Sequence, residues 1–268
     1  MKNLDFEEAL ELTLQFNESR GVPRNGPQKS VLQQFNIETY KMLFDSYQAA
    51  PKMTFRQVRS KHYSSNVRPY FDGLNYFCDY ELSIKHYENL VGNLIQSFCP
   101  NPKCIIDIGA GSGDLIRYLS KIFPIKCIAI ENSHFALSII SQVNLRENFS
   151  IETQFGDFNK ENFTVPENSF IFSSYSLMYS GTNLNLFSEI LASNPHSGIF
   201  IEPIFEDQQN DFLSELIRSY MIHNKYSTDW FSRFKQACET YGYKIVLHQK
   251  NVLAHNLMLP VSIIGWRK

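Results

Sequence analysis

The stretch Cys104-Ile-Ile-Asp-Ile-Gly-Ala-Gly-Ser-Gly-Asp-Leu-Ile-Arg-Tyr-Leu119 is the most informative part of this 268-residue sequence. Its apolar start predicts a buried strand over 104–108, and its amphipathic continuation predicts a helix over 114–122. Between them, Gly109, Gly111 and Gly113 stand at alternate positions, although the whole chain has only 12 glycines. Glycine accepts a positive φ and lets a ligand approach the backbone closely. A strand, a glycine loop and a helix in this order are typical of nucleotide sites in open α/β sheets.

Downstream of Pro102, short apolar runs alternate with helical patterns. Strands are predicted over 104–108, 127–130, 151–155, 170–174 and 199–203, with helices over 114–122, 133–143 and 183–192. This alternation predicts an α/β fold with an open, mostly parallel sheet and helices on both faces. After a polar helical stretch over 206–241, two successive strands follow over 243–249 and 259–266. Because no helix separates them, they are predicted to pair as an antiparallel C-terminal hairpin.

The first hundred residues show helical patterns without the alternating short apolar runs. Helices are predicted over 5–16, 29–49 and 80–98, whereas 56–77 is predicted to be irregular and is rich in aromatic residues. Pro100-Asn101-Pro102 then breaks the chain. We predict an N-terminal helical cap over 1–100 and a ligand-binding core over 101–268. An alternative is that the apolar faces of these helices form a homodimer interface, because such faces must be buried against something.

Composition and charge exclude several classes of protein. Lys and Arg total 25 against 27 Asp and Glu, so a nucleic-acid partner is unlikely, because gripping a phosphate backbone needs a basic face. The five cysteines are scattered without a Cys-x-x-Cys pair, which is typical of reduced thiols in a cytoplasmic protein. The acidic N-terminus lacks a signal-peptide pattern, and no apolar run is long enough for a membrane span. We therefore expect a soluble cytoplasmic protein with no membrane partner.

The glycine pattern also separates two kinds of nucleotide ligand. The dinucleotide fingerprint would place its third glycine at Asp114, where a carboxylate would repel a pyrophosphate. Gly-x-Gly-x-Gly with Asp107 two residues before it instead resembles motif I of class I S-adenosylmethionine-dependent methyltransferases. This resemblance covers roughly 80–268 and includes the Glu-Pro end of the strand at 199–203 and the terminal hairpin. It implies a Rossmann-like seven-stranded sheet and S-adenosyl-L-methionine as cofactor, with S-adenosyl-L-homocysteine as product.

The resemblance assigns cofactor contacts to the strand ends. Glu131 is implied to bind the ribose hydroxyls, Asp157 the adenine amino group, and Phe158 an adenine face. Ser174 and Tyr175 would contact the methionine portion. The implied cofactor-binding residues are Asp107, Gly109, Ala110, Gly111, Gly113, Glu131, Asn132, Asp157, Phe158, Ser174 and Tyr175.

The methyl acceptor is less well defined. Base-amine methyltransferases share an Asn/Asp-Pro-Pro-Tyr/Phe sequence that 173–179 lacks, and Ser173 and Ser174 do not supply the acidic cluster of metal-dependent catechol-type enzymes. We expect metal-independent, in-line methyl transfer to a small-molecule or peptide acceptor, assisted by proximity and in some acceptors by a general base. The candidate catalytic residues are Glu202, His223 and Tyr175, and the candidate substrate-binding residues are Tyr63, Tyr70, Tyr80 and Tyr179. His248 and His255 lie in the terminal hairpin and are expected to be away from the chemistry.

Two other functions remain open. An aminopropyl-type transferase could use the same scaffold, but such enzymes have acidic residues for a polyamine, and we find no such cluster after the fourth strand. A non-catalytic binding module could retain the fold and the nucleotide. The presence of Asp107, Gly111, Glu131 and Asp157 favours a functional cofactor site over that reading.

Overall fold

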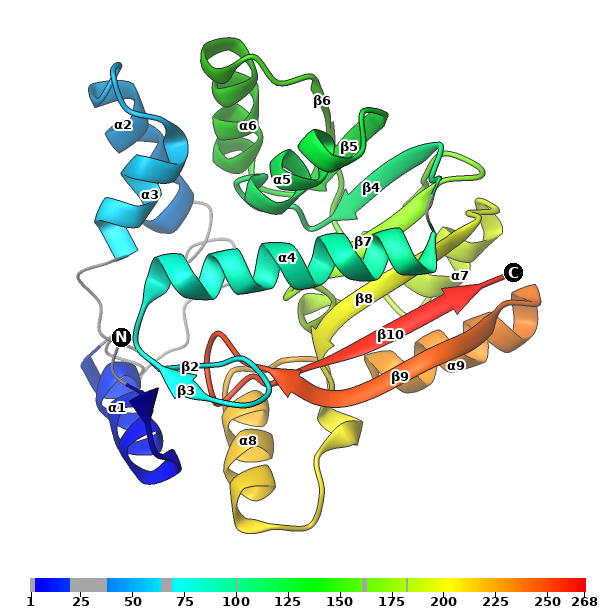
Figure 1. The fold of residues 1–268 in the computed structure, drawn as a ribbon. Coiled ribbons are helices and arrows are strands. Elements are labelled where there is room, and N and C mark those ends of the chain that lie inside the picture. Colours follow the sequence, from blue (N-terminus) through cyan, green and yellow to red (C-terminus); the bar gives the residue numbers. More distant parts are fainter. Residues whose placement is uncertain (1–2, 20–37, 64–68, 100, 161–162, 182) are drawn as a thin grey trace.

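The computed structural model describes residues 3–19, 38–63, 69–99, 101–160, 163–181 and 183–268 (Figure 1). Its centre is a seven-stranded sheet with the order β6-β5-β4-β7-β8-β10-β9. The strands are β4 (Cys104–Ile108), β5 (Lys126–Glu131), β6 (Ile151–Phe155), β7 (Phe170–Ser174), β8 (Ser197–Pro203), β9 (Lys244–Leu253) and β10 (Val261–Arg267). The pairs formed among β4 to β8 are parallel, whereas β10 runs antiparallel to both β8 and β9. The predicted fold class and the C-terminal hairpin are confirmed.

Helices cover both faces of this sheet. They are α4 (Tyr80–Phe98), α5 (Asp114–Ile122), α6 (His134–Glu147), α7 (Leu186–Ala192) and α9 (Trp230–Tyr241). In β4, Ile105 packs with Val91 of α4 on one face, while Ile106 packs with Phe187 of α7 and Phe234 of α9 on the other. Successive side chains of a strand point to opposite faces, so a run of isoleucines can fill both cores. Figure 1 shows α4 lying along one face of the sheet.

The strand order reverses beside β4. From β4 the chain moves outward through β5 to β6, and then crosses back to β7 on the other side of β4. Loops that leave the carboxyl ends of β4 and β7 therefore diverge, and open α/β sheets bind ligands at such a switch point. The glycine loop follows β4 directly, so the topology places it at this position.

The N-terminal region is more ordered than the sequence predicts. It contains α1 (Phe6–Ser19), α2 (Lys41–Ala49), α3 (Phe55–Tyr63) and a small sheet of β1 (Asn3–Leu4), β2 (Tyr70–Phe71) and β3 (Tyr76–Phe77). The prediction of an irregular segment over 56–77 is wrong. Phe55 and Val58 lie one turn apart and are buried against α2 and α6, a pattern that the polar residues of α3 conceal. Of the helix predicted over 29–49, α2 occupies 41–49, and residues 29–37 lie outside the described part.

The apolar face of α2 is buried within the chain. Leu43 and Tyr47 pack with Ile139 and Val143 of α6 in one hydrophobic cluster. Glu147 of α6 accepts hydrogen bonds from the Tyr47 hydroxyl at 2.9 Å and from the Phe55 amide at 2.6 Å. Helices α2 and α3 are thereby fixed to α6, the helix that follows β5.

Two short 3-10 helices, η2 (Leu177–Tyr179) and η3 (Phe205–Asp207), follow β7 and β8, and α8 (Phe212–His223) precedes α9. The stretch predicted as helical over 206–241 is thus two α-helices. Among the described residues, no helix combines the length and hydrophobicity that crossing a membrane requires. The five cysteines are all present as free thiols.

Candidate functional site

The glycine loop is compact, and its conformation requires glycine. Gly109, Gly111 and Gly113 have φ of +76°, +53° and +77°. A Cβ on Gly109 would lie 2.4 Å from Cβ of Ser176, and one on Gly113 would lie 2.7 Å from Cγ1 of Ile140. The sequence pattern thus reflects both backbone conformation and close packing of the loop against α6 and the turn after β7.

Glu131 ends β5 and lies directly beside this loop. Its Oε2 accepts a hydrogen bond from the Gly111 amide at 2.8 Å, and its Oε1 accepts from the amides of Asn132 and Ser133 at 2.9 Å. Burial raises the pKa of Glu131, and these three backbone donors oppose the shift. A carboxylate has about four lone-pair positions, so one on Oε2 remains for a hydroxyl donor.

Asp107 is a buried acid without a hydrogen-bond partner in the described part of the chain. The residue is only 3% exposed and is the last but one of β4. Burial raises its pKa to about 8, with further contributions from the negative charges of Glu131 and Glu202. A buried carboxyl group near two other acids is stabilised in its ionised form by a cation. The strand ends therefore favour a positively charged ligand.

Asp114 stands where the dinucleotide fingerprint would have its third glycine. Its carboxylate forms ion pairs and hydrogen bonds with side chains of this chain. Its Oδ2 accepts from Nη1 of Arg59 at 2.5 Å and from Oγ of Ser112 at 2.6 Å, and its Oδ1 accepts from Nη2 of Arg117 at 2.6 Å. Burial alone would raise its pKa, but Arg59 and Arg117 outweigh burial and lower it to about 2. Arg59 belongs to α3, so this ion pair joins α3 to α5, the helix after the glycine loop.

Three tyrosines of the N-terminal region lie at or near this loop or stack on each other: Tyr40, Tyr63 and Tyr80. The Tyr40 hydroxyl lies 2.6 Å from where a Cβ on Gly111 would stand. Burial raises the pKa of Tyr40 strongly, and the charge of Glu131 adds to the shift. Tyr63 stacks on Tyr80 with ring centroids 5.5 Å apart. The structure thus stacks Tyr63 on Tyr80, and it places Tyr40, which the sequence did not single out, beside Gly111.

Glu202 is wholly buried beneath the turn that follows β7. Its two carboxylate oxygens accept from the Ser176 amide at 3.0 and 2.9 Å, and Oγ of Ser173 lies 2.7 Å from Oε1. Burial raises its pKa to about 7. With no exposed surface, Glu202 fixes the turn that carries Ser174 and Tyr175, which is a positioning role.

A second aromatic cluster lies beyond the end of β7. Tyr175 has φ of +54°, and its Oη accepts a hydrogen bond from the His255 amide at 3.0 Å. The His255 ring lies 4.8 Å from that of Tyr87 and 5.7 Å from that of Tyr70, measured between centroids. The hydroxyls of Tyr87 and Ser174 are hydrogen-bonded to each other. His255, which was expected to lie away from the chemistry, is held beside Tyr175 and Tyr87 because the loop between β9 and β10 folds back onto the end of β7.

The remaining candidate residues lie in different surroundings and do not form one cluster with those above. Phe158 is buried in the core against Phe163, and its ring tip lies under Gly109. Oδ1 of Asp157 accepts from the Asn159 amide at 3.0 Å, so part of this carboxylate forms a local turn. His223 is exposed at the end of α8.

Tyr179 and His248 occupy different environments. Tyr179, in η2, packs edge-on against Tyr226 at 5.3 Å, and burial raises its pKa strongly. Nε2 of His248 lies 2.7 Å from Oδ2 of Asp207, on the side of the hairpin next to η3. Within the described residues, no three His, Cys, Asp or Glu side chains are grouped so that they could hold a metal ion.

Comparison with known proteins identifies the fold of this chain. No protein-family model and no curated protein matches the sequence. Magnesium protoporphyrin IX methyltransferase from Synechocystis PCC 6803, solved with bound S-adenosylhomocysteine, has a TM-score of 0.54 and 9% identity over 69% of this chain and 83% of that one. The chain has the fold of class I S-adenosylmethionine-dependent methyltransferases.

A second neighbour supports the same fold. Geranyl diphosphate C-methyltransferase from Streptomyces coelicolor A3(2), solved with Mg²⁺, geranyl diphosphate and S-adenosylhomocysteine, has a TM-score of 0.51. It is 10% identical over 70% of this chain and 81% of that one. At such identities the similarity establishes the architecture, and the chemistry must be argued from the side chains of this chain.

Proposed function

We propose that this protein is an S-adenosylmethionine-dependent methyltransferase that acts on a small-molecule or peptide acceptor without a metal ion. The observation that carries the proposal is Asp107, a buried carboxyl group with no hydrogen-bond partner among the described residues, beside a glycine loop at the switch point. S-adenosylmethionine has a sulfonium and an ammonium group, so it supplies the positive charge that Asp107 and Glu131 favour. Both structural neighbours described above are named as methyltransferases.

The residues at the strand ends fit this cofactor. The remaining lone pair of Glu131 is available to a ribose hydroxyl, and the positive-φ glycines allow the ligand to lie close to the backbone. We assign the adenine amino group to Asp157 and the methionine portion to Ser174 and Tyr175. When bound, the cofactor supplies an electrophilic methyl group for in-line displacement.

The protein's contribution to catalysis is then mainly to orient the acceptor and to exclude water. Proximity of this kind contributes about 7–11 kcal/mol to lowering a barrier. We propose that the cluster of Tyr70, Tyr87, Tyr175 and His255 borders the acceptor, and that Tyr63 and Tyr80 close the site from the cap side. Glu202 acts through the turn that it holds, and the exposed His223 is the weakest candidate for a base.

We further propose that residues 1–100 act as a cap on the core of 101–268 in a cytoplasmic protein. The Arg59–Asp114 ion pair and the burial of α2 on α6 support the cap. Helix α4 packs into the same hydrophobic core as the sheet. In this proposal the part of the cap that reaches the glycine loop and α5 therefore precedes α4, at Tyr40 and Arg59. A homodimer through α1 remains a proposal, which the native mass of the protein tests.

Calorimetric titration of the whole protein with S-adenosylmethionine, S-adenosylhomocysteine and NAD tests the function. We expect both sulfur ligands to bind in the micromolar range, about −8 kcal/mol, and NAD not to bind. Glu131→Ala should weaken binding about a hundredfold, because it removes a charge-assisted hydrogen bond of about 1.5–3 kcal/mol to the ribose. Glu239→Ala, at an exposed glutamate of α9, serves as the matched control. Absence of binding by either sulfur ligand to the folded protein would refute the proposal.

A further inference from the structure

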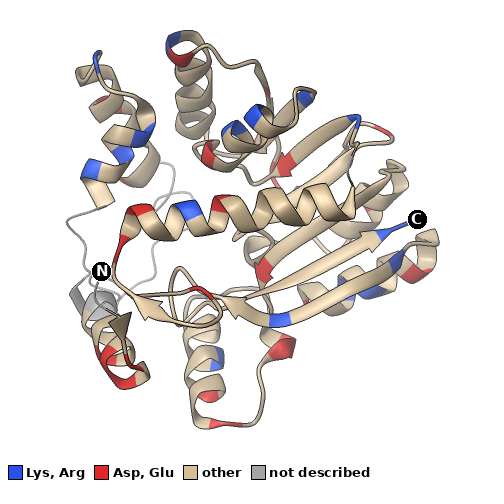
Figure 2. Cartoon of the chain, in the orientation of Figure 1, with Lys and Arg blue, Asp and Glu red and all other residues tan. Residues whose placement is uncertain are grey.

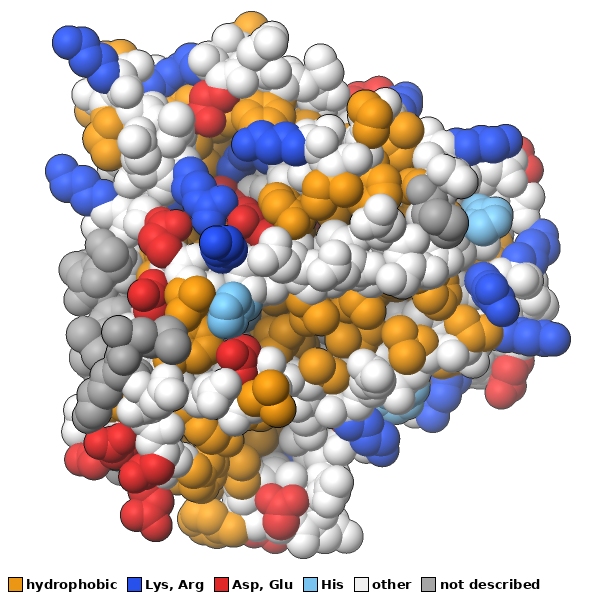
Figure 3. All heavy atoms as spheres, in the orientation of Figure 1, with side chains coloured by type: hydrophobic (Ala, Val, Ile, Leu, Met, Phe, Trp, Pro, Cys, Tyr) orange, Lys and Arg blue, Asp and Glu red, His pale blue; other side chains and the backbone are white. Residues whose placement is uncertain are grey.

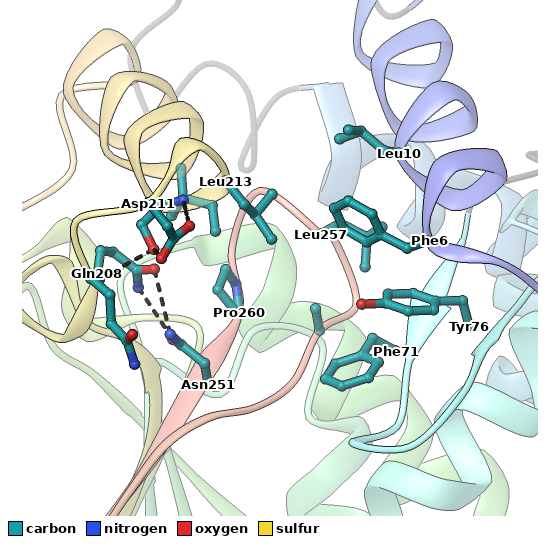
Figure 4. Close-up of a pocket in the computed structure, with 14 residues that line it drawn as sticks. Phe6, Leu10, Phe71, Tyr76, Gln208, Asp211, Leu213, Asn251, Leu257 and Pro260 are labelled. Carbon is teal, nitrogen blue, oxygen red and sulfur yellow. Dashed lines mark hydrogen bonds between the residues drawn. The ribbon is translucent and has the colours of Figure 1, made fainter.

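A second cavity, of about 290 Å³, lies apart from the glycine loop (Figure 4). Its walls come from α1, the β2–β3 hairpin, α8, the segment between η3 and α8, and the loop between β9 and β10. None of its lining residues is among the cofactor-binding residues assigned above. The lining residues that recognise a ligand are Phe71, Tyr76, Gln208, Asp211 and Asn251.

One side of this cavity is aromatic. The rings of Phe71 and Tyr76 stack with centroids 4.9 Å apart and planes at 25°, and the Phe6 ring lies 5.9 Å from Tyr76. Leu10 and Leu257 complete this side, and Figure 4 shows the Tyr76 hydroxyl directed toward the cavity. Flat aromatic groups prefer offset or edge-on contact with such rings. This side therefore suits the aromatic body of a ligand.

The opposite side is polar and presents hydrogen-bond acceptors (Figure 4). Nε2 of Gln208 donates to the Ile204 carbonyl at 3.0 Å and to Oδ1 of Asn251 at 3.2 Å, which uses both of its N–H groups. The amide oxygens of Gln208 and Asn251 keep free lone pairs. Asp211 caps α8 by accepting from the Ser214 amide at 2.9 Å, and hydrogen bonds from Ser214 lower its pKa. Nδ2 of Asn251 donates to Oε1 of Gln208 at 3.5 Å, and the lone pairs left on the two amide oxygens suit a head group that donates hydrogen bonds.

The charges around the cavity favour a cation. Besides Asp211, helix α1 carries Glu7, Glu8 and Glu11 and has no basic residue in its last turn (Figure 2). In Figure 3, acidic side chains gather over α1 beside hydrophobic ones over α8. Arg218 is a nearby positive charge, and its Nη1 donates to the backbone carbonyls of Gln208 and Gln209 at 3.0 and 2.8 Å. Arg218 also contributes to lowering the pKa of Asp211, so it offsets part of that charge, while the carboxylates of α1 add negative charge beside the cavity.

We propose that this cavity binds an arylalkyl amine, with the aromatic body against Phe71 and Tyr76 and the ammonium group at Gln208, Asn251 and Asp211. The proposal does not depend on the cofactor. It adds a second ligand site whose wall, the loop between β9 and β10, also carries His255 to the end of β7.

Calorimetry with three indoles of matched size tests the ligand class on the full chain. Tryptamine has an ammonium head, tryptophol a neutral hydroxyl, and indole-3-acetate a carboxylate. We expect tryptamine to bind at least about fivefold more tightly than tryptophol, and indole-3-acetate to bind most weakly. Saturating S-adenosylhomocysteine should leave tryptamine affinity unchanged. Displacement by S-adenosylhomocysteine, equal binding of the acetate, or no binding of tryptamine would each overturn the proposal.

Two variants locate the site. Asp211→Asn keeps a good helix cap but removes the charge, so tryptamine affinity should fall to that of tryptophol. Leu10→Trp should fill the apolar side and abolish binding of all three indoles, whereas Leu74→Ala, at a residue 88% exposed and outside the lining, should change nothing. If Leu10→Trp fails to fold, Asp211→Asn decides alone. Unchanged preference for the amine in a folded Asp211→Asn variant contradicts the proposal.

Discussion

Replacing Asp107 by asparagine should make the ligand-free protein more stable and the cofactor complex weaker. The side chain is almost fully buried in β4 and has no hydrogen-bond partner among the described residues. Burial raises its pKa to about 8, and the charges of Glu131 and Glu202 act in the same direction. An asparagine side chain has nearly the same shape but lacks the ionisable group. The two effects of Asp107→Asn have opposite signs because the charge opposes folding but favours the cationic cofactor.

The stability effect follows from the difference between the folded and unfolded pKa. The unfolded carboxyl group ionises near its ordinary value of 3.8, whereas in the folded protein it stays protonated up to about 8. Folding therefore takes up a proton between these values, and the contribution of Asp107 to stability is lost as the pH rises from about 4 to about 8. At 1.36 kcal/mol per pKa unit, Asp107→Asn should stabilise the ligand-free protein by up to about 4 kcal/mol at pH 7. Near pH 4 the gain should be close to zero.

The binding effect has its own pH dependence. Between about pH 5.5 and 7, the cofactor's ammonium group is fully charged, because α-amino groups titrate near 7.7–8. Ionising Asp107 in the complex then releases one proton, so affinity for S-adenosylmethionine should rise about tenfold per pH unit. In Asp107→Asn this slope should be absent. Glu202 is present in both proteins, so the comparison isolates Asp107.

Urea denaturation followed by circular dichroism, at several pH values between 4 and 8, measures the stability difference between the two proteins. Calorimetry in buffers of different ionisation enthalpy measures the released proton. A stability gain that does not grow with pH, or a loss of stability in Asp107→Asn, would refute the electrostatic argument. Equal proton release by both proteins would show that Asp107 does not face the bound cofactor.

Two further predictions concern the glycine loop and the ion pair between α3 and α5. Gly113→Ala should lower the free energy of unfolding by about 1–3 kcal/mol, since φ is +77° and a Cβ has no room. Gly181→Ala, where a Cβ meets no atom within 4 Å, should have little effect in the same denaturant titration. Arg59→Met should cost about 1–3 kcal/mol, because it leaves part of the negative charge of the partly buried Asp114 unpaired. Lys41→Met, which removes an ion pair with both side chains about half exposed, should cost less than about 0.5 kcal/mol, and an equal cost for both variants would contradict the role of Arg59 as an anchor.

The sequence alone determined much of the sheet and the loop at its centre. The strands predicted over 104–108, 151–155 and 170–174 have those bounds in the structure, and the terminal hairpin forms as expected. Such features are local, because a short apolar run or a glycine at every second position constrains its own backbone directly. Glu131 was also found in this way, since its place after a predicted strand sets its position next to the glycine loop.

Only the tertiary structure decided which distant residues complete the site. Arg59 reaches Asp114 across 55 positions of sequence, and His255 reaches Tyr87 from the opposite end of the chain. It also showed that Glu202, a candidate for catalysis, is buried as the support of a turn. Periodicity reports which face of an element is buried but not which other element buries it. These pairings arise when α2 and α3 pack against α5 and α6 and when the last loop folds onto the end of β7, so the sequence pattern could not give them.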